Sequence, residues 1–175
     1  RKLKLAELNR LSTAEFRRAE KIPVIVVLDQ VRSAMNIGSV FRTADAFRLE
    51  AIYLVGITAT PPNRDILKTA LGATETVAWA YFKNPEECLA KLREQGAELL
   101  CVEQSDRSVM LHEFSPDPGR TCALVFGNEV EGVSEVFMQA CAACIEVPQW
   151  GTKHSLNVAV CAGIVLWEFV KPAKD

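Results

Sequence analysis

Three polar segments that each follow an apolar run contain the side chains best suited to chemistry. They span Asp29–Arg42, Gly127–Ser134 and Gln149–Asn157. The apolar runs before them are typical of buried strands, and the carboxyl ends of parallel strands meet at one edge of a sheet, where α/β proteins bind their ligands. We therefore expect the three segments to lie together and to form one ligand site.

The first segment contains an amide and a guanidinium. Arg42 is flanked by Phe41 and Ala44, an apolar setting that favours a functional role for this guanidinium over a surface arginine with its stem packed down. Asn36 lies six positions earlier, nearly two helical turns away, so the two side chains cannot be direct neighbours on a helix. We still expect both to face the strand ends.

The second and third segments offer hydrogen-bonding groups. The residues from Gly127 to Gly132 predict a tight turn with exposed amides, in which Glu129 accepts hydrogen bonds at the sheet edge, although neither G-x-G-x-x-G nor a Walker lysine is present. His154 and Ser155 are adjacent, which seldom suits nucleophilic catalysis, and no G-x-S-x-G pattern surrounds them. Ser155 is better interpreted as the N-cap of the last helix.

The order of strands and helices predicts how these segments are held. Six runs are predicted to be strands: Val24–Leu28, Ala51–Val55, Thr76–Phe82, Glu98–Val102, Cys122–Phe126 and Ile145–Val147. Helices alternate with them, so we expect an α/β domain with a mostly parallel sheet of about six strands flanked by helices. The last helix, Leu156–Val170, is apolar almost all round and is predicted to be buried.

The amino-terminal residues differ from the remainder in charge. Residues 1–21 have a net charge of +4 within a chain whose net charge is −2. Leu5, Leu8 and Leu11 predict a short amphipathic helix, and the residues from Ser12 to Glu15 predict a capping box that opens a second one. This basic helical arm, residues 1–22, either binds the phosphate backbone of a nucleic acid or is simply a solvated helical face.

The remaining composition is that of an ordinary globular protein. With 175 residues, of which 49% are apolar, one domain is expected. The longest apolar run, Val158–Trp167, is too short to span a membrane and no secretory signal is expected, which predicts a cytoplasmic protein without membrane contact. Among six cysteines, Cys141 and Cys144 form a C-x-x-C pair without a second close pair, so we expect packing roles and no metal site.

Taken together, the three segments resemble the SpoU/TrmH group of SPOUT RNA ribose methyltransferases. The first motif is similar to Asn36-x-Gly38-x-x-x-Arg42-Thr43-Ala44-Asp45-Ala46-Phe47. The second is similar to Leu124-Val125-Phe126-Gly127-Asn128-Glu129-x-x-Gly132, and the third to Ile145-x-Val147-Pro148 followed by Ser155-Leu156-Asn157-Val158. All three occur in family order between Pro23 and Val170, a combination far more specific than any one motif.

The resemblance implies a fold and an activity. It implies a methyltransferase domain over residues 23–175 with a C-terminal deep trefoil knot, a homodimer whose sites draw on both chains, and S-adenosyl-L-methionine as the cofactor. The reaction would transfer a methyl group to a ribose 2′-hydroxyl of tRNA or rRNA. Two alternatives stay open: a non-catalytic RNA-binding member of the same fold, and a nucleotide-dependent oxidoreductase on an unknotted sheet, which the missing G-x-G-x-x-G pattern disfavours.

The resemblance also implies roles for residues. Arg42 would act on the 2′-hydroxyl, by binding phosphate and stabilising a developing alkoxide rather than as a strict base, because arginine stays protonated. The other catalytic residues would be Asn36, Glu129, Ser155 and Asn157. Cofactor contacts would come from Glu103, Gln104, Gly127, Asn128, Glu129, Gly132, Ile145, Val147, Pro148, Ser155, Leu156 and Asn157. RNA contacts are expected at Arg32, Arg48 and Lys153.

Overall fold

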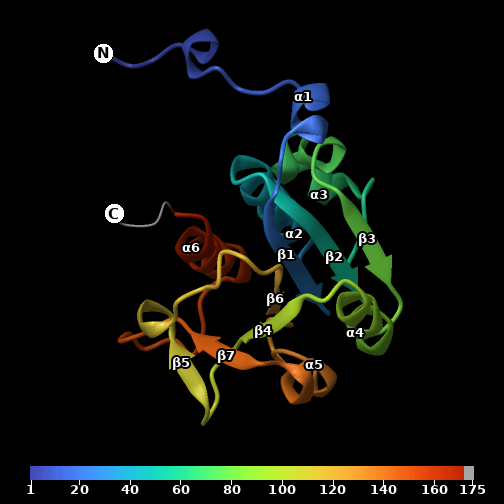
Figure 1. The fold of residues 1–175 in the computed structure, drawn as a ribbon, viewed down its shortest axis with the longest axis vertical. Coiled ribbons are helices and arrows are strands. Elements are labelled where there is room, and N and C mark those ends of the chain that lie inside the picture. Colours follow the sequence, from blue (N-terminus) through green and yellow to red (C-terminus); the bar gives the residue numbers. More distant parts are fainter. Residues whose placement is uncertain (172–175) are drawn as a thin grey trace.

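The computed structural model of the protein describes residues 1–171, so the end of the predicted domain, residues 172–175, lies outside the described residues. Seven strands of the described chain form one sheet in the order β3-β2-β1-β6-β4-β7-β5, and every neighbouring pair is parallel (Figure 1). The predicted α/β fold with a parallel sheet is therefore confirmed. The strands are β1 (Ile22–Asp29), β2 (Leu49–Val55), β3 (Trp79–Phe82), β4 (Glu98–Val102), β5 (Ser108–Met110), β6 (Cys122–Phe126) and β7 (Ala143–Glu146).

Helices cover both faces of the sheet, and each face has its own apolar core. α2 (Ala34–Ala46), α3 (Arg64–Ala70) and α6 (Val158–Val170) pack on one face, and α4 (Pro85–Glu94) and α5 (Glu135–Ala140) pack on the other (Figure 1). Alternate residues of β1 divide between the cores, since Val26 and Leu28 belong to the first and Ile25 and Val27 to the second. Burial on both faces explains why the central strands are continuous apolar runs in the sequence.

The sheet has one strand more than predicted. β5 has only three half-buried residues at the sheet edge beside β7, so it lacks the apolar run by which the other strands are recognised. The strand predicted over Thr76–Phe82 is shorter and begins at Trp79, since a 3₁₀ turn at Ala73–Glu75 lies just before it. The strand predicted at Ile145–Val147 is β7 and ends at Glu146.

The last helix begins later than predicted. The N-cap of α6 is Asn157, whose Oδ1 accepts the N–H groups of the second and third helical residues at 3.0 and 3.2 Å. The prediction of Ser155 as the N-cap is therefore wrong. Asparagine is as good a cap as serine, and because the Asn157 oxygen already satisfies the helix end, Ser155 remains in the loop before it.

The last helix is also less buried than predicted. Val160, Ile164 and Trp167 lie on one side of α6 and are between 40% and 54% exposed. The opposite side, which includes Ala162 and Val165, is fully buried against the sheet. Apolar character all round the helix therefore does not mean burial all round it within a single chain.

The amino-terminal arm divides into a docked and a projecting part. α1 (Thr13–Arg18) begins with the predicted capping box at Ser12 and buries Phe16 in the core on the α2 face. The residues before it project away from the sheet, and the expected amphipathic helix is only an exposed 3₁₀ turn, Leu5–Leu8 (Figure 1). The arm lies at the amino ends of β1 and β2, opposite the edge at which these strands end (Figure 1).

Candidate active site

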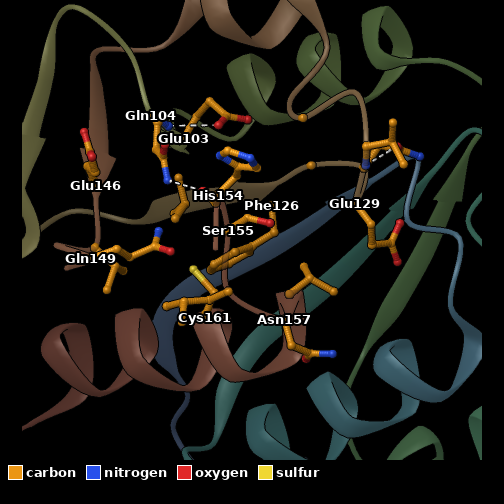
Figure 2. Close-up of a pocket in the computed structure, with 18 of the residues that line it drawn as sticks. Glu103, Gln104, Phe126, Glu129, Glu146, Gln149, His154, Ser155, Asn157 and Cys161 are labelled. Atoms are coloured by element: carbon orange, nitrogen blue, oxygen red, sulfur yellow. Dashed lines mark hydrogen bonds between the residues drawn. The ribbon is translucent and has the colours of Figure 1, made fainter. Parts of the chain in front are cut away.

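A cavity of about 630 Å³ lies at the carboxyl ends of β4, β6 and β7, beside the start of α6 (Figure 2). Residues from all three predicted segments line it, so the expectation that these segments lie together is confirmed. Every residue expected to contact the cofactor, with the exception of Pro148, lines this cavity: Glu103, Gln104, Gly127, Asn128, Glu129, Gly132, Ile145, Val147, Ser155, Leu156 and Asn157.

Backbone hydrogen bonds and the Asn128 side chain together close the turn after β6. Asn128 and Gly132 exchange two backbone hydrogen bonds, each of 3.0 Å. The Asn128 Oδ1 accepts the N–H groups of Val130 at 2.8 Å and Glu131 at 2.9 Å. The turn was expected to present exposed amides, but these four amides are already hydrogen-bonded. For two of them the Asn128 side chain takes the place of a ligand as the acceptor. A Cβ on Gly127 would lie 2.2 Å from the Gly132 carbonyl carbon, so only glycine fits there.

Glu129 joins the second segment to the first. Its Oε2 accepts the Arg32 N–H at 3.0 Å and its Oε1 accepts the Ser33 N–H at 3.2 Å. Ser33 is the N-cap of α2, so this carboxylate lies at the positive end of the helix, where negative charge is favourable. Glu129 therefore accepts hydrogen bonds at the sheet edge, as expected, and its partners are backbone groups of the β1–α2 loop.

Asn157 joins the third segment to the first. While its Oδ1 caps α6, its Nδ2 donates to the Asn36 Oδ1 at 3.2 Å. Both asparagines line the cavity, so the first turns of α2 and α6 meet at its wall. Ser155 lines the cavity from the loop before α6.

The basic residues do not gather at this cavity. Within the described chain, Arg42 is exposed on α2 and is not among the cavity-lining residues, so only Asn36 of the expected pair reaches the site. Arg32 follows β1 and Lys153 lies in the loop after β7, and both are exposed near the carboxyl edge. Arg48 lies at the opposite edge, where its carbonyl oxygen accepts the Ile22 N–H at 2.9 Å.

Several lining residues were not among those expected to bind the cofactor or to act in catalysis, and Cys161 is the clearest case. It lies one helical turn after Asn157, so the helical period would have placed both on one side of α6. Burial, followed by the nearby charge of Glu103, raises the pKa of the Cys161 thiol to about 11, so this thiol is neutral near pH 7. Other lining residues of this kind are Val102, Phe126, Val130, Glu146, Gln149, His154 and Val158.

Asp29 is a buried carboxyl group behind the site. It ends β1, and its Oδ2 accepts the Ser134 N–H at 2.7 Å, which fixes the far end of the segment that begins at Gly127. Its Oδ1 has no hydrogen-bond partner within residues 1–171. Burial raises the pKa of Asp29, and the hydrogen bonds from Ser134 oppose this only in part.

Comparison with known proteins identifies the family. The model of the SpoU rRNA methylase family matches residues 23–167. This chain belongs to that family. Among its relatives is the 23S rRNA (guanosine-2′-O-)-methyltransferase RlmB of Neisseria meningitidis, which is 33% identical over 146 residues, covering 83% of this chain and 57% of the relative. The resemblance stated from the three motifs is confirmed, and the family match contradicts the oxidoreductase interpretation.

Solved structures of the SpoU type have the same fold. An AdoMet-bound rRNA methyltransferase from Sinorhizobium meliloti has a TM-score of 0.79 at 28% identity, covering 88% of this chain and 59% of that one. A TrmH/SpoU tRNA modifying enzyme from A. aeolicus has a TM-score of 0.78 at 26% identity, covering 91% of this chain and 81% of that one. The chain thus spans less than two thirds of the Neisseria and Sinorhizobium proteins.

Two kinds of feature are absent from the described part of this SpoU family member. In residues 1–171, no group of three or more His, Cys, Asp or Glu side chains is arranged to hold a metal ion. The same residues contain no helix with both the length and the apolar character that a membrane crossing requires.

Proposed function

We propose that this SpoU family member transfers a methyl group from S-adenosylmethionine to a ribose 2′-hydroxyl of RNA. The observation that carries the proposal is the convergence of the three motif segments on one cavity, through Asn36, Glu129 and Asn157. The similarity to a 23S rRNA guanosine 2′-O-methyltransferase and to an AdoMet-bound rRNA methyltransferase supports the same chemistry here.

The cavity suits S-adenosylmethionine in size and in chemistry. Its volume of about 630 Å³ is within the range of about 300–1,000 Å³ in which proteins hold small ligands. Apolar side chains such as Phe126 and Val147 line it together with polar ones such as Asn128 and Ser155, which suits a ligand that is part purine and part amino acid. Bound there, the cofactor would supply a methyl group on a sulfonium, which is a good leaving group.

The protein has to align the ribose hydroxyl for in-line attack and help it to lose its proton. In this proposal Arg42 binds a phosphate of the RNA and stabilises the developing alkoxide with its fork-shaped guanidinium. Asn36, held by Asn157, orients the RNA at the wall of the cavity. Because Arg42 lies on the exposed side of α2, we propose that a second chain completes the site around it.

The proposed second chain is another copy of this protein, bound through α6. Val160, Ile164 and Trp167 recur at helical spacing and form an exposed apolar stripe on a helix whose other side is core. A contiguous exposed apolar stripe is typical of an interface rather than of a monomer surface. The stripe begins next to the Asn157 cap, so a partner seated on it would lie beside the cavity.

We also propose that the chain forms the trefoil knot that the resemblance implies. β6 lies between β1 and β4, and the chain then reaches β7 on the far side of β4 before α6 returns to the α2 face. The segment between β5 and β6 lies against α6, since the rings of Phe114 and Phe169 stack with centroids 5.8 Å apart. A helix held between this segment and the sheet supports threading of the C-terminal part through a loop.

Ribosomal RNA is the proposed substrate class, with the cytoplasm as the place of action. The family description and the Neisseria relative both name rRNA, although the relative from A. aeolicus is a tRNA modifying enzyme. Arg32 and Lys153 are proposed to contact RNA near the cavity. Arg48 and the basic arm are proposed to contact it at the opposite edge of the sheet.

The proposal is tested by methyl transfer from labelled S-adenosylmethionine to total cellular RNA separated by size. We expect label in large rRNA as a 2′-O-methylnucleoside, and its loss in Arg42→Ala. Arg93→Ala, which changes an exposed arginine on α4 far from the motifs, is the matched control and should retain transfer. Cofactor binding without transfer to any RNA class would instead favour the non-catalytic RNA-binding alternative.

A further inference from the structure

Two consecutive residues at the end of β4 each hold a different loop of the cavity. The Glu103 Oε2 accepts the Val133 N–H at 3.1 Å, which ties down the turn that begins at Gly127. The Gln104 Nε2 donates to the His154 carbonyl oxygen at 2.8 Å, which ties down the loop after β7 (Figure 2). Neither Glu103 nor Gln104 belongs to the three motifs.

The backbone of Glu103 is itself held by β7. Its N–H donates to the Ile145 carbonyl oxygen at 3.1 Å, and its carbonyl oxygen accepts the Cys144 thiol at 3.4 Å. The Glu103 Oε1 also accepts the N–H of Gln104 at 2.8 Å, so the orientations of the two residues are linked. Because β7 holds the Glu103 backbone in place, the side chains of Glu103 and Gln104 can hold both loops in defined positions.

Gly132 is matched to the Glu103 carboxylate. A Cβ at position 132 would lie 2.3 Å from the Glu103 Oε2, and the backbone there has a φ of +73°. The positive φ favours glycine, because other residues rarely adopt it. A Cβ there would also push the flexible Glu103 carboxylate away from the Val133 N–H. The glycine of the second motif therefore also leaves room for the carboxylate of a residue outside the motifs.

We propose that Glu103 and Gln104 are positioning residues for the cofactor, which couple the Gly127–Val133 loop to the Gln149–Asn157 loop and set the gap between them. This inference rests on the proposed function, because it assigns the gap to S-adenosylmethionine. It differs from a direct contact, since the two side chains act through the loops and order them before any ligand binds. Loss of either hydrogen bond would loosen one wall of the cavity and weaken cofactor binding.

The test uses Gln104→Glu, which preserves size but removes the donor to His154. Hydrogen exchange of the amides at positions 150–155 is measured in the ligand-free protein, and the Kd of S-adenosylmethionine by calorimetry. We expect exchange at these positions to rise and the Kd to rise, each about three- to tenfold, as the loss of one hydrogen bond implies. Gln139→Glu makes the same chemical change on the exposed side of α5 and should alter neither.

Glu103 gives a second, independent test. Glu103→Ala removes the acceptor for Val133 and should raise exchange at positions 128–133, whereas Glu103→Gln retains an acceptor oxygen and should restore protection. Exchange in β1 and α2 should be unchanged in every variant, which separates loop positioning from a general loss of stability.

Two results would overturn the inference. In the first, the Kd rises while loop exchange in the ligand-free protein is unchanged, which would mean direct contact. In the second, Gln104→Glu and Gln139→Glu are indistinguishable. Failure of the parent protein to bind S-adenosylmethionine would instead refute the proposed function, and exchange in the free protein would still decide whether the two residues position the loops.

Discussion

The Asn157 Nδ2 donates to the Asn36 Oδ1 at 3.2 Å, which links two residues 121 positions apart in the chain. Asn157 performs two tasks at once, because its Oδ1 caps α6 while its amide nitrogen holds the start of α2. The two tasks can be separated by mutation. Removing Asn36 deletes the link alone, and removing Asn157 deletes both the link and the cap.

Asn157→Ala is expected to lower the free energy of unfolding by about 1 kcal/mol, the usual cost of removing an asparagine cap. Asn36→Ala should cost less, because the cap remains and only a partly exposed hydrogen bond is lost. Urea unfolding of both variants measures the difference. Equal losses would show that the capping bonds contribute nothing beyond the link.

Gly127→Ala is expected to lower the free energy of unfolding by more than about 2 kcal/mol. The added methyl group would lie 2.2 Å from the Gly132 carbonyl carbon and 2.3 Å from the Val133 nitrogen, and this peptide group is backbone that cannot move freely. Gly151→Ala is the matched control, because a Cβ there meets nothing within 4 Å. Thermal or urea unfolding checks both, and a Gly127→Ala variant as stable as Gly151→Ala would contradict this account.

The ionisation of Asp29 should contribute to the pH dependence of the free energy of unfolding. Its pKa is raised in the folded protein, so the folded state binds the proton more tightly than the unfolded state does. The contribution of Asp29 is therefore fully present below the unfolded pKa of about 3.9 and is lost as the pH rises through the raised folded pKa. Asp29→Asn cannot ionise and should not show this decline.

Urea unfolding of the parent and of Asp29→Asn at several pH values from 4 to 8 makes the comparison. The expected result is a difference in unfolding free energy that shifts in favour of Asn as the pH rises. A difference that does not change with pH would mean that Asp29 has an ordinary pKa in the folded state.

Ile164→Lys is expected to convert the proposed homodimer to a monomer, because it places a charge in the apolar stripe of α6. Ile164 is 40% exposed, and Leu67 on α3 is 42% exposed, so Leu67→Lys is a matched control at a similar apolar position. Sedimentation equilibrium gives the mass of each variant. A parent protein that is already monomeric would contradict the homodimer outright.

Arg42→Lys is expected to lower methyl transfer at least about tenfold with little change in cofactor Kd. Lysine keeps the charge but not the planar fork that contacts phosphate and alkoxide together. Single-turnover transfer to the labelled RNA class, beside calorimetric cofactor binding, separates the two effects. Turnover near that of the parent would show that a point charge is sufficient.

The central strands could be predicted because a strand that is buried on both faces is a continuous apolar run in the sequence, such as residues 24–28. β5 could not be predicted, because an edge strand of three half-buried residues has no such apolar run. The cap of α6 was misplaced because Ser155 and Asn157 are equally good caps, and only tertiary structure, here the contact with Asn36, distinguishes them. The exposed stripe was missed because periodicity does not reveal which side of an apolar helix the rest of the chain covers.

Glu129 and Asn157 could be predicted as site residues because each has a polar side chain and lies in a segment that follows a predicted strand. Cys161 and Glu146 were missed because they look like ordinary helix and strand residues until the cavity is seen. The self-closing turn at Asn128 was missed for a different reason, since the pattern alone does not say whether its amides bind a ligand or a side chain of the turn.

The distance between the cavity and the arm has a consequence for the choice of RNA. β1 has eight residues and runs from the arm to the carboxyl edge, about 26 Å at 3.3 Å per residue. One RNA that touches both ends of a single subunit must therefore extend at least that far, and a nuclease footprint should show two protected patches with an accessible stretch between them. An oligonucleotide shorter than this would report on the cavity alone.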